Sequence, residues 1–360
     1  MSKESRMPDP DFFPDPDQDL VTELYRDNRN PPTGAIAITP VATVPEADSP
    51  DPDFLPASAY PQTTPIPVIS AAVAQARTAP EIYTHGHHES VVLSHARRTV
   101  KNSAAYLVPY LRPGQSLLDV GCGPGTITID LAGRLAPGRV VGVDASDEVL
   151  AVARSRAAAA TRSAVAETSG SDEPAESGAT PEFVTGSAYA LDFSDNTFDV
   201  VHAHQLLQHL SNPVAALREF ARVARPGGLV AARDVDYSGI VWYPQLPGLD
   251  TWLRVYQAVH RGNGGEPDAG RRLKSWALAA GLGEVTITAS VWCFASERDC
   301  RWWGQSWAER ALKSGFATDA LAAGHASQDE LQQISDAWRK WSEHPEATFI
   351  MPHGEIVARA

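Results

Sequence analysis

The sequence predicts an α/β protein built on a doubly wound, mostly parallel sheet, and two observations carry this prediction. Between residues 116 and 235, short apolar runs alternate with stretches of helical periodicity. One apolar run leads directly into a glycine-rich loop that opens a helix, which is the ligand-binding turn typical of such sheets. Strands that alternate with helices form βαβ units with right-handed crossovers, and these units build parallel sheets.

The expected elements follow one another in a regular order. Apolar and β-branched composition predicts strands at residues 116–120, 139–144, 182–185, 198–203 and 229–235. Helical periodicity predicts helices at residues 125–135, 147–166 and 213–224. Asn212 and Pro213 supply a cap and a first-turn proline for the last helix, and Pro226 with the two glycines after it is expected to end that helix.

After residue 237 the pattern becomes helical and rich in tryptophan, with further strands expected at 285–290 and 355–358. Trp303 and Trp307 would share one face of a helix, because residues four apart lie one turn above each other. Packing in a core is the plainer interpretation of these rings, and a lid over a substrate is the alternative. The candidate substrate contacts are therefore Trp302, Trp303 and Trp307.

Two segments have a composition that disfavours a packed core. Residues 1–80 hold fifteen of the 28 prolines and repeat Asp-Pro pairs, which predicts a disordered tail. Residues 167–180 are small and polar and interrupt an otherwise regular alternation, so we expect a surface insertion there. Residues 81–360 are expected to form one domain.

Charge and composition narrow the class of partner. The net charge of −14 and the pI of about 5.2 argue against nucleic acid or an anionic membrane as the main partner. The longest apolar runs are too short to cross a bilayer, and no secretory signal pattern is visible. The cysteines, Cys122, Cys293 and Cys300, form no CxxC pair. A cytoplasmic protein without a metal is therefore expected.

The sharpest motif is LLDVGCGPGT at residues 117–126, in which glycines at 121, 123 and 125 allow a ligand to approach the backbone closely. The spacing is GxGxG and not the GxGxxG of dinucleotide-binding loops. Asp119, just before the loop, would repel a pyrophosphate but suits the cationic amino-acid end of S-adenosylmethionine (SAM). Asp144 ends the next predicted strand, where a carboxylate could accept hydrogen bonds from both ribose hydroxyls.

The chain resembles the class I SAM-dependent methyltransferases, and within them the branch typified by the ubiquinone and menaquinone C-methyltransferases. The resemblance spans residues 83–237 and rests on that glycine motif, on VVGVDAS at 140–146, on TFDVVHAHQLLQHL at 197–210 and on LREFARVARPGGLV at 217–230. It implies a Rossmann-like sheet whose last strand enters antiparallel at the edge, with a helical lid at about residues 297–345. SAM is then the expected cofactor.

The resemblance also implies which residues contact that cofactor. They are Tyr83, His87, Asp119, Gly121, Cys122, Gly123, Gly125, Asp144, Ala145, Ser187, Ala188 and Gln205. One departure concerns the adenine contact, because the family usually has Gly-Asp-Ala where this chain has Gly186, Ser187 and Ala188. Ser187 and the backbone of Ala188 are expected to replace the missing carboxylate.

Histidines mark two further places. The segment YTHGHHES at 83–90 is similar to one in fungal secondary-metabolite members of this branch, including gliotoxin bis-thiomethyltransferase, and the similarity implies a segment that closes over the cofactor, followed by a helix from about 89 to 110. A metal site there is disfavoured, since the adjacent His87 and His88 cannot both point the same way. His85 and His204 are the candidate general bases.

Methyl transfer to a small hydrophobic or aromatic acceptor is the predicted function. An NAD-dependent oxidoreductase shares the fold but is disfavoured by Asp119 and the loop spacing. A non-catalytic protein of the same fold, acting as a regulator or scaffold, remains the alternative. The residues do not indicate whether carbon, oxygen, nitrogen or sulfur is methylated.

Overall fold

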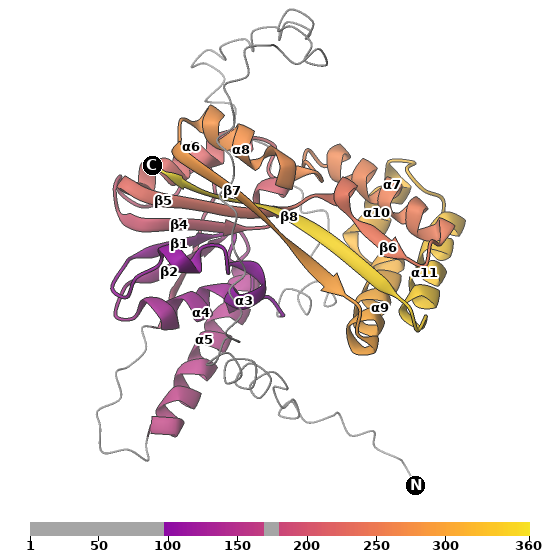
Figure 1. Cartoon of the computed structure of the whole chain (residues 1–360), viewed down its shortest axis with the longest axis horizontal. Helices are drawn as coiled ribbons and strands as arrows, with labels where there is room; N and C mark the ends of the chain where they lie inside the picture. Colours follow the sequence, from indigo (N-terminus) through magenta and orange to yellow (C-terminus); the bar gives the residue numbers. More distant parts are fainter. Residues whose placement is uncertain (1–96, 169–179) are drawn as a thin grey trace, which may run out of the picture. The chain divides into compact units, whose positions relative to one another are not determined.

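The computed structural model describes residues 97–168 and 180–360, and its centre is a mixed β-sheet with helices on both faces (Figure 1). Among the described residues the sheet has eight strands in the spatial order β3-β2-β1-β4-β5-β8-β6, and β7 pairs with β8. The strands are β1 (Leu117–Val120), β2 (Val140–Asp144), β3 (Glu182–Thr185), β4 (Phe198–His204), β5 (Ala224–Val235), β6 (Val241–Tyr243), β7 (Gly283–Phe294) and β8 (Thr348–Arg359).

The helices connect these strands and build a separate helical region after β5. The α-helices are α3 (Val100–Ser103), α4 (Thr126–Leu135), α5 (Asp147–Thr168), α6 (Pro213–Val223), α7 (Pro247–Gly262), α8 (Ala269–Ala280), α9 (Glu297–Lys313), α10 (Gly315–Ala322) and α11 (Gln328–Ser342). Short 3-10 turns are η4 (Val108–Tyr110), η5 (Leu207–His209) and η6 (Tyr237–Gly239).

The parallel half of the sheet confirms the predicted βαβ units. β1 lies between β2 and β4, and β2 with β3 and β4 with β5 are parallel pairs as well. The central strands are buried on both faces, which explains their continuous apolar runs. Leu117 packs with Leu131 of α4 on one face, whereas Leu118 packs with Leu217 of α6 and Leu273 of α8 on the other. This packing leaves the carboxyl ends of the strands accessible for a ligand site.

The start of α6 is as predicted and its end lies within one residue of the prediction, but Pro226 is not what ends it. Asn212 caps the helix by accepting a hydrogen bond from the Ala215 amide, with Pro213 in the first turn. The helix ends at Val223, before the proline that was expected to end it, and β5 begins at once. The chain before β4 contributes to this end, because the Thr197 amide donates to the Val223 carbonyl. Pro226 and its glycines lie within β5, where the register with β4 shifts.

The final strand is antiparallel, as expected, but it does not lie at the edge of the sheet. β8 pairs with β5 and β6 along one side and with β7 along the other. Both β7 and β8 are twice as long as the sequence suggested or longer. Proline and glycine are typical of turns, yet Pro352 and Gly354 lie in the middle of β8. Strand pairing on both sides overrides the local propensity there.

The helices α7, α9, α10 and α11 form a second core, rich in tryptophan, beside β6 and the neighbouring ends of β7 and β8 (Figure 1). Trp252 of α7 lies at its centre, with ring-centroid distances of 4.8 Å to Trp307 and 5.0 Å to Trp338 in edge-to-face geometry. Gly304 lets α9 approach α11 closely, since a Cβ there would lie 2.5 Å from the Ser342 Cβ. The predicted lid range therefore holds helices with a core of their own.

The helix expected from residue 89 to 110 does not continue through its described part. Thr99 and Asn102 form a capping box that starts the four-residue helix α3, and an irregular stretch with η4 follows. The capping box explains the break, because it fixes a helix start at Val100. The predicted tail, most of the 167–180 insertion, and Tyr83, His85 and His87 lie outside the described residues.

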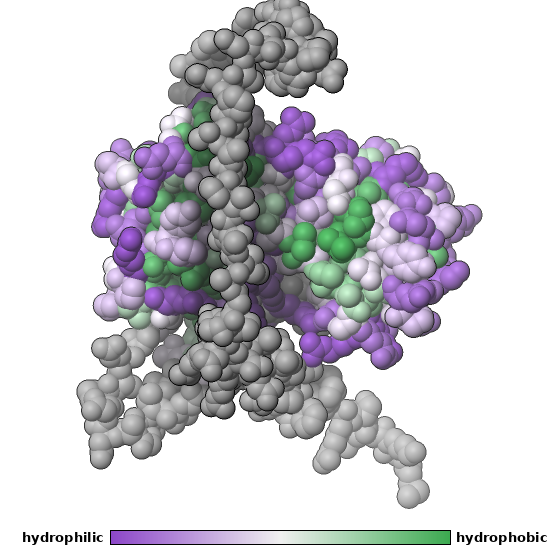
Figure 2. All heavy atoms as spheres, in the orientation of Figure 1, coloured by the Kyte–Doolittle hydropathy of each residue, from purple (hydrophilic) through white to green (hydrophobic). Residues whose placement is uncertain are grey.

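Two further observations concern the hydropathy of the surface and of the helices. On the face drawn in Figure 2, hydrophilic residues make up most of the rim of the described chain, and hydrophobic residues gather in patches nearer the middle. Within residues 97–168 and 180–360, no helix has the length and apolar composition needed to span a membrane.

Candidate functional site

The glycine loop between β1 and α4 adopts a backbone that its glycines make possible. Gly121, Gly123 and Gly125 have φ values of +71°, +54° and +78°, a region that other residues rarely enter. A Cβ at Gly121 or Gly125 would lie under 3.0 Å from Leu206 or Phe183 side-chain atoms. A Cβ at Gly123 would meet nothing within 4 Å, so the backbone there is open to a ligand.

Asp144 ends β2 beside this loop, as predicted. Its Oδ2 accepts a hydrogen bond from the Gly123 amide at 2.9 Å, and its Oδ1 accepts one from the Ser146 amide at 3.0 Å. The side chain is half-buried, and a carboxylate has further lone pairs that could accept ribose hydroxyls. Ala145, the next residue, is exposed. The loop and the acid thus form one unit at the carboxyl end of the sheet.

Asp119 lies beneath the loop and is only 2% exposed. Its Oδ2 accepts a hydrogen bond from the Thr128 hydroxyl at 2.6 Å, and its Oδ1 lies 2.8 Å from Nδ1 of His202. Nothing in the sequence indicates that Asp119 pairs with His202, but the two occupy matching positions on the neighbouring strands β1 and β4. Its negative charge therefore acts from below the loop. Burial, and then Asp119, raises the pKa of the Cys122 thiol well above its ordinary value, which keeps that group neutral.

Ser187 and Ala188 follow β3 and lie near Asp144 in the fold, because the Gly186 amide donates to the Asp144 carbonyl at 3.0 Å. The Ser187 hydroxyl accepts a hydrogen bond from the Tyr189 amide at 3.2 Å. Their contact with an adenine ring stays a prediction.

Gln205 stands at the end of β4 in a left-handed conformation with φ +50°, which is uncommon for a side chain of this type. Its Oε1 accepts a hydrogen bond from Nη2 of Arg98 at 2.6 Å, and its Nε2 lies 2.8 Å from Nε2 of His353. His353 donates its other ring nitrogen, Nδ1, to the Met351 carbonyl at 3.0 Å, so Nε2 is left to accept from Gln205. Sequence reasoning missed Arg98 and His353, which come from distant parts of the chain.

His204, a predicted general base, is 5% exposed and packs near the rings of Trp292 and His353, at centroid distances of 5.8 and 6.4 Å. Burial, and then the cations Arg98 and Arg233, lower its pKa well below the ordinary value. An imidazole that is so disfavoured in its charged form is a weak proton acceptor. The electrostatics of the described residues thus give the base role no support.

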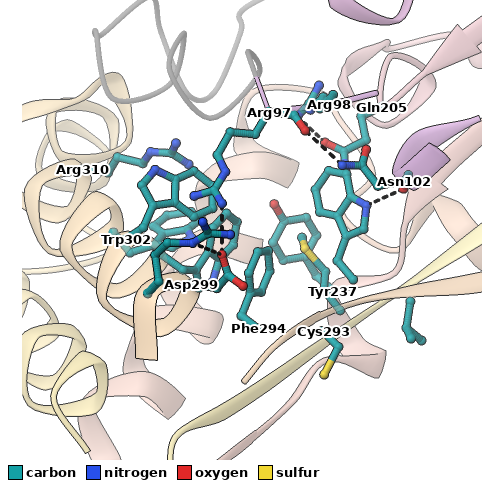
Figure 3. Close-up of a pocket in the computed structure, with 16 residues that line it drawn as sticks. Arg97, Arg98, Asn102, Gln205, Tyr237, Cys293, Phe294, Asp299, Trp302 and Arg310 are labelled. Carbon is teal, nitrogen blue, oxygen red and sulfur yellow. Dashed lines mark hydrogen bonds and ion pairs between the residues drawn. The ribbon is translucent and has the colours of Figure 1, made fainter. Parts of the chain in front are cut away.

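A cavity of about 370 Å³ opens beside Gln205 (Figure 3). Its walls come from the segment before α3, from β7, from η6 and from α9. The aromatic lining residues are Tyr237, Trp292, Phe294, Trp302, Trp303 and Trp307. The three predicted tryptophan contacts therefore lie at this cavity, and Trp303 and Trp307 belong to the second core as well, at 5% and 1% exposed. The core interpretation of the tryptophan cluster is confirmed for Trp303 and Trp307, and contact of these rings with a substrate stays a prediction.

Behind the Trp292 ring lies a buried ion pair. Arg233 of β5 is 1% exposed, places its guanidinium 5.1 Å from the centroid of that ring, and donates from Nε to Glu355 at 3.2 Å. Glu355 also accepts hydrogen bonds from Thr288 and Ser290. Burial lowers the pKa of Arg233 to about 10, so it stays charged at neutral pH. The ion pair of Arg233 and Glu355 therefore supports the Trp292 ring, which forms part of the cavity wall.

Comparison with known proteins agrees with this geometry. Residues 118–232 match a family model described as a methyltransferase domain. An uncharacterized methyltransferase of Schizosaccharomyces pombe is 35% identical, covering 76% of this chain and 95% of that protein. The protein named "Probable methyltransferase ltbC" of Aspergillus luteorubrus is 32% identical, covering 77% of this chain and 96% of that protein.

Among solved structures, a Haemonchus contortus phosphoethanolamine N-methyltransferase bound to SAM matches with 17% identity and a TM-score of 0.42, covering 71% of this chain and 51% of that one. The residues matched by the family model include the glycine loop and the acid that ends β2. The chain belongs to the SAM-dependent methyltransferases.

Proposed function

We propose that this enzyme methylates a small molecule with a hydrophobic or aromatic body, and that the acceptor binds in the cavity beside Gln205. One observation carries the proposal: a cavity of about 370 Å³ with aromatic walls is lined by Gln205, which directly follows β4. The next residue, Leu206, packs against Gly121 of the glycine loop. That volume and lining are typical of sites for small organic ligands.

The residues of the glycine loop and of the strand ends beside it fit SAM. Asp144 would hold the ribose hydroxyls, the open backbone at Gly123 would receive the methionine end, and Ser187 would lie toward the adenine. When bound, SAM supplies an already activated methyl group. The task of the chain is therefore to hold the acceptor close and in line, which contributes several kcal/mol in well-oriented reactions.

The acceptor side requires orientation more than proton transfer. Gln205 lines the cavity and precedes Leu206, which packs against Gly121 of the glycine loop. The chain of hydrogen bonds from Met351 through His353 to Gln205 fixes which way its amide points. Its Oε1 is held by Arg98 on the other side. We infer that Gln205 positions the acceptor. We also propose that this chain belongs to the branch of the quinone C-methyltransferases, or to the fungal secondary-metabolite enzymes within that branch.

Transfer of labelled methyl from SAM to a panel of phenols, quinols and thiols tests this function. Trp302→Ala is expected to raise KM for any acceptor found by about tenfold, the effect of losing one aromatic contact, with SAM affinity unchanged. Tyr243→Ala is the matched control, since Tyr243 is 54% exposed and does not line the cavity. SAM binding without transfer to any acceptor of the panel would instead favour the regulator or scaffold.

A further inference from the structure

The charged side chains around the cavity are mainly guanidinium groups. Among the described lining residues the cations are Arg97, Arg98, Arg298 and Arg310, and the only carboxylate is Asp299. The whole chain carries a net charge of −14, so the cavity has the opposite sign to the molecule around it. Low-dielectric aromatic walls strengthen such a local field, which favours an anionic ligand.

The guanidinium groups lie at different places around the cavity. Arg98 lies beside Gln205 at the end of β4, where it donates a hydrogen bond to that residue. Arg97 and Arg298 both lie near Asp299, at 3.0 and 3.9 Å, so this single carboxylate is shared between them. In Figure 3 Arg310 lies on the opposite side of the cavity from Arg98 and Gln205.

Arg310 has the setting of a recognition residue. It is 3% exposed although it lines a cavity, and its guanidinium carbon lies 5.2 Å from the centroid of the Trp307 ring. Trp307 precedes it by one turn of α9, so both side chains share a helix face. An aromatic face holds a guanidinium in place while its N–H groups remain directed along its plane, where they match the two oxygens of a carboxylate.

Building on the proposed function, we propose that the acceptor is an aromatic carboxylic acid whose carboxylate binds Arg310. Its aromatic body then lies along the tryptophans of α9 and β7, and the end that is methylated points toward Gln205. The acid group and the methylated group are therefore at opposite ends of the acceptor. The positive field of Arg97 and Arg298 attracts the acid to the cavity.

Calorimetric titration of the full chain, saturated with S-adenosylhomocysteine, compares 2-naphthoate with 2-naphthamide, which differ in charge but hardly in shape. The wild type is expected to bind the acid about tenfold more tightly, the strength of a charge-assisted hydrogen bond pair. Arg310→Gln is expected to remove this preference while the amide still binds. Arg301→Gln is the matched control, because Arg301 is on the same helix, pairs with Glu297 at the surface and does not line the cavity.

A second variant keeps the test sharp if Arg310→Gln fails to fold. Arg298→Gln removes an exposed cation and should weaken naphthoate about threefold, with the amide unaffected. Equal binding of acid and amide by the wild type overturns the acid proposal and leaves the aromatic acceptor site standing. Failure of the wild type to bind either compound overturns the aromatic acceptor site itself. If both variants still bind the acid more tightly than the amide, the roles proposed for Arg310 and Arg298 are wrong.

Discussion

Asp144 is the residue that we expect to contribute most directly to SAM binding. Replacement by alanine removes both the acceptor for ribose hydroxyls and the hydrogen bond that holds the Gly123 amide, so SAM affinity should fall by about 1–3 kcal/mol. Asp144→Asn keeps one acceptor oxygen and should lose less. Calorimetric titration with SAM measures both. Asp147→Ala, at the start of α5, is the control, and wild-type affinity in the Asp144→Ala protein would contradict the assigned role.

Asp234 is a buried carboxyl group with an unusual titration. Burial raises its pKa from 3.8 to about 7, against the hydrogen bond that it accepts from the Gln208 amide. Between these pH values the folded state keeps a proton that the unfolded state has released, so this group makes stability fall as pH rises from about 4 to about 7. Asp234→Asn should remove that loss, stabilising the protein at pH 8 by on the order of 1–4 kcal/mol and hardly at pH 4.5.

Thermal unfolding at the two pH values measures the difference. Asparagine can still accept the Gln208 hydrogen bond, so packing is matched in the comparison. An equal change in Tm at pH 4.5 and pH 8 would show that Asp234 is ionised in the fold.

At the scale of elements, the contact between α9 and α11 depends on Gly304. A Cβ at this position would lie 2.5 Å from the Ser342 Cβ and 2.7 Å from the Trp338 carbonyl oxygen, so Gly304→Ala should separate the helices and destabilise the fold by about 1–3 kcal/mol. Gly133→Ala in α4 is the opposite case, because a Cβ there meets nothing within 4 Å. It should stabilise by about 0.5–1 kcal/mol through helix propensity.

Urea unfolding of both variants gives the two free energies. Destabilisation by both substitutions to the same extent would mean that close packing at Gly304 is not the reason for its presence.

Elements with a local signal were predictable, and those made by distant pairing were not. β1, β2 and β4 were located to within a residue because each is an apolar run bounded by polar residues or glycines. β6 has three residues and no periodicity, and it exists because β8 pairs with it. The middle of β8 was not predicted because Pro352 and Gly354 disfavour a strand locally, whereas pairing on both sides decides the conformation.

The same division applies to the site. The glycine loop and Asp144 were predictable because one short stretch of sequence sets the backbone of the loop and the strand end beside it. Arg98, His353 and Arg310 were not predictable, since they come together only through the fold: one precedes α3, one lies on β8 and one lies on α9. Isolated arginines and histidines in a sequence give no sign of such convergence.

For the whole molecule, three buried histidines contribute to a loss of stability in acid. Burial lowers the pKa of His260 to about 4 and holds the pKa values of His204 and His353 well below their ordinary range. Below pH 6.5 the unfolded state takes up protons that these rings cannot accept in the fold, so stability falls as pH falls from about 6.5 to about 4. Asp234 has the opposite effect on stability in this pH range, but it is a single group, whereas three histidines act in the other direction.

Tm should therefore decrease from pH 7 to pH 4.5, and His260→Gln should make that decrease shallower. Glutamine can still donate to the Gln208 carbonyl, which Nε2 of His260 contacts at 2.8 Å. Scanning calorimetry across this pH range measures the slope. A variant with the wild-type slope would show that His260 titrates normally in the fold.

The position of β8 has a consequence for how the chain acquires its structure during synthesis. This strand is the last described element to leave the ribosome, yet it supplies Phe349 to the tryptophan core, Glu355 to Arg233, and the shared border of β5, β6 and β7. Until it arrives, three strands have unpaired borders and an internal cation has no counter-ion. These surfaces stay uncovered in the nascent chain until β8 emerges, so chaperone dependence and sensitivity to truncation should both concentrate in the residues of β8.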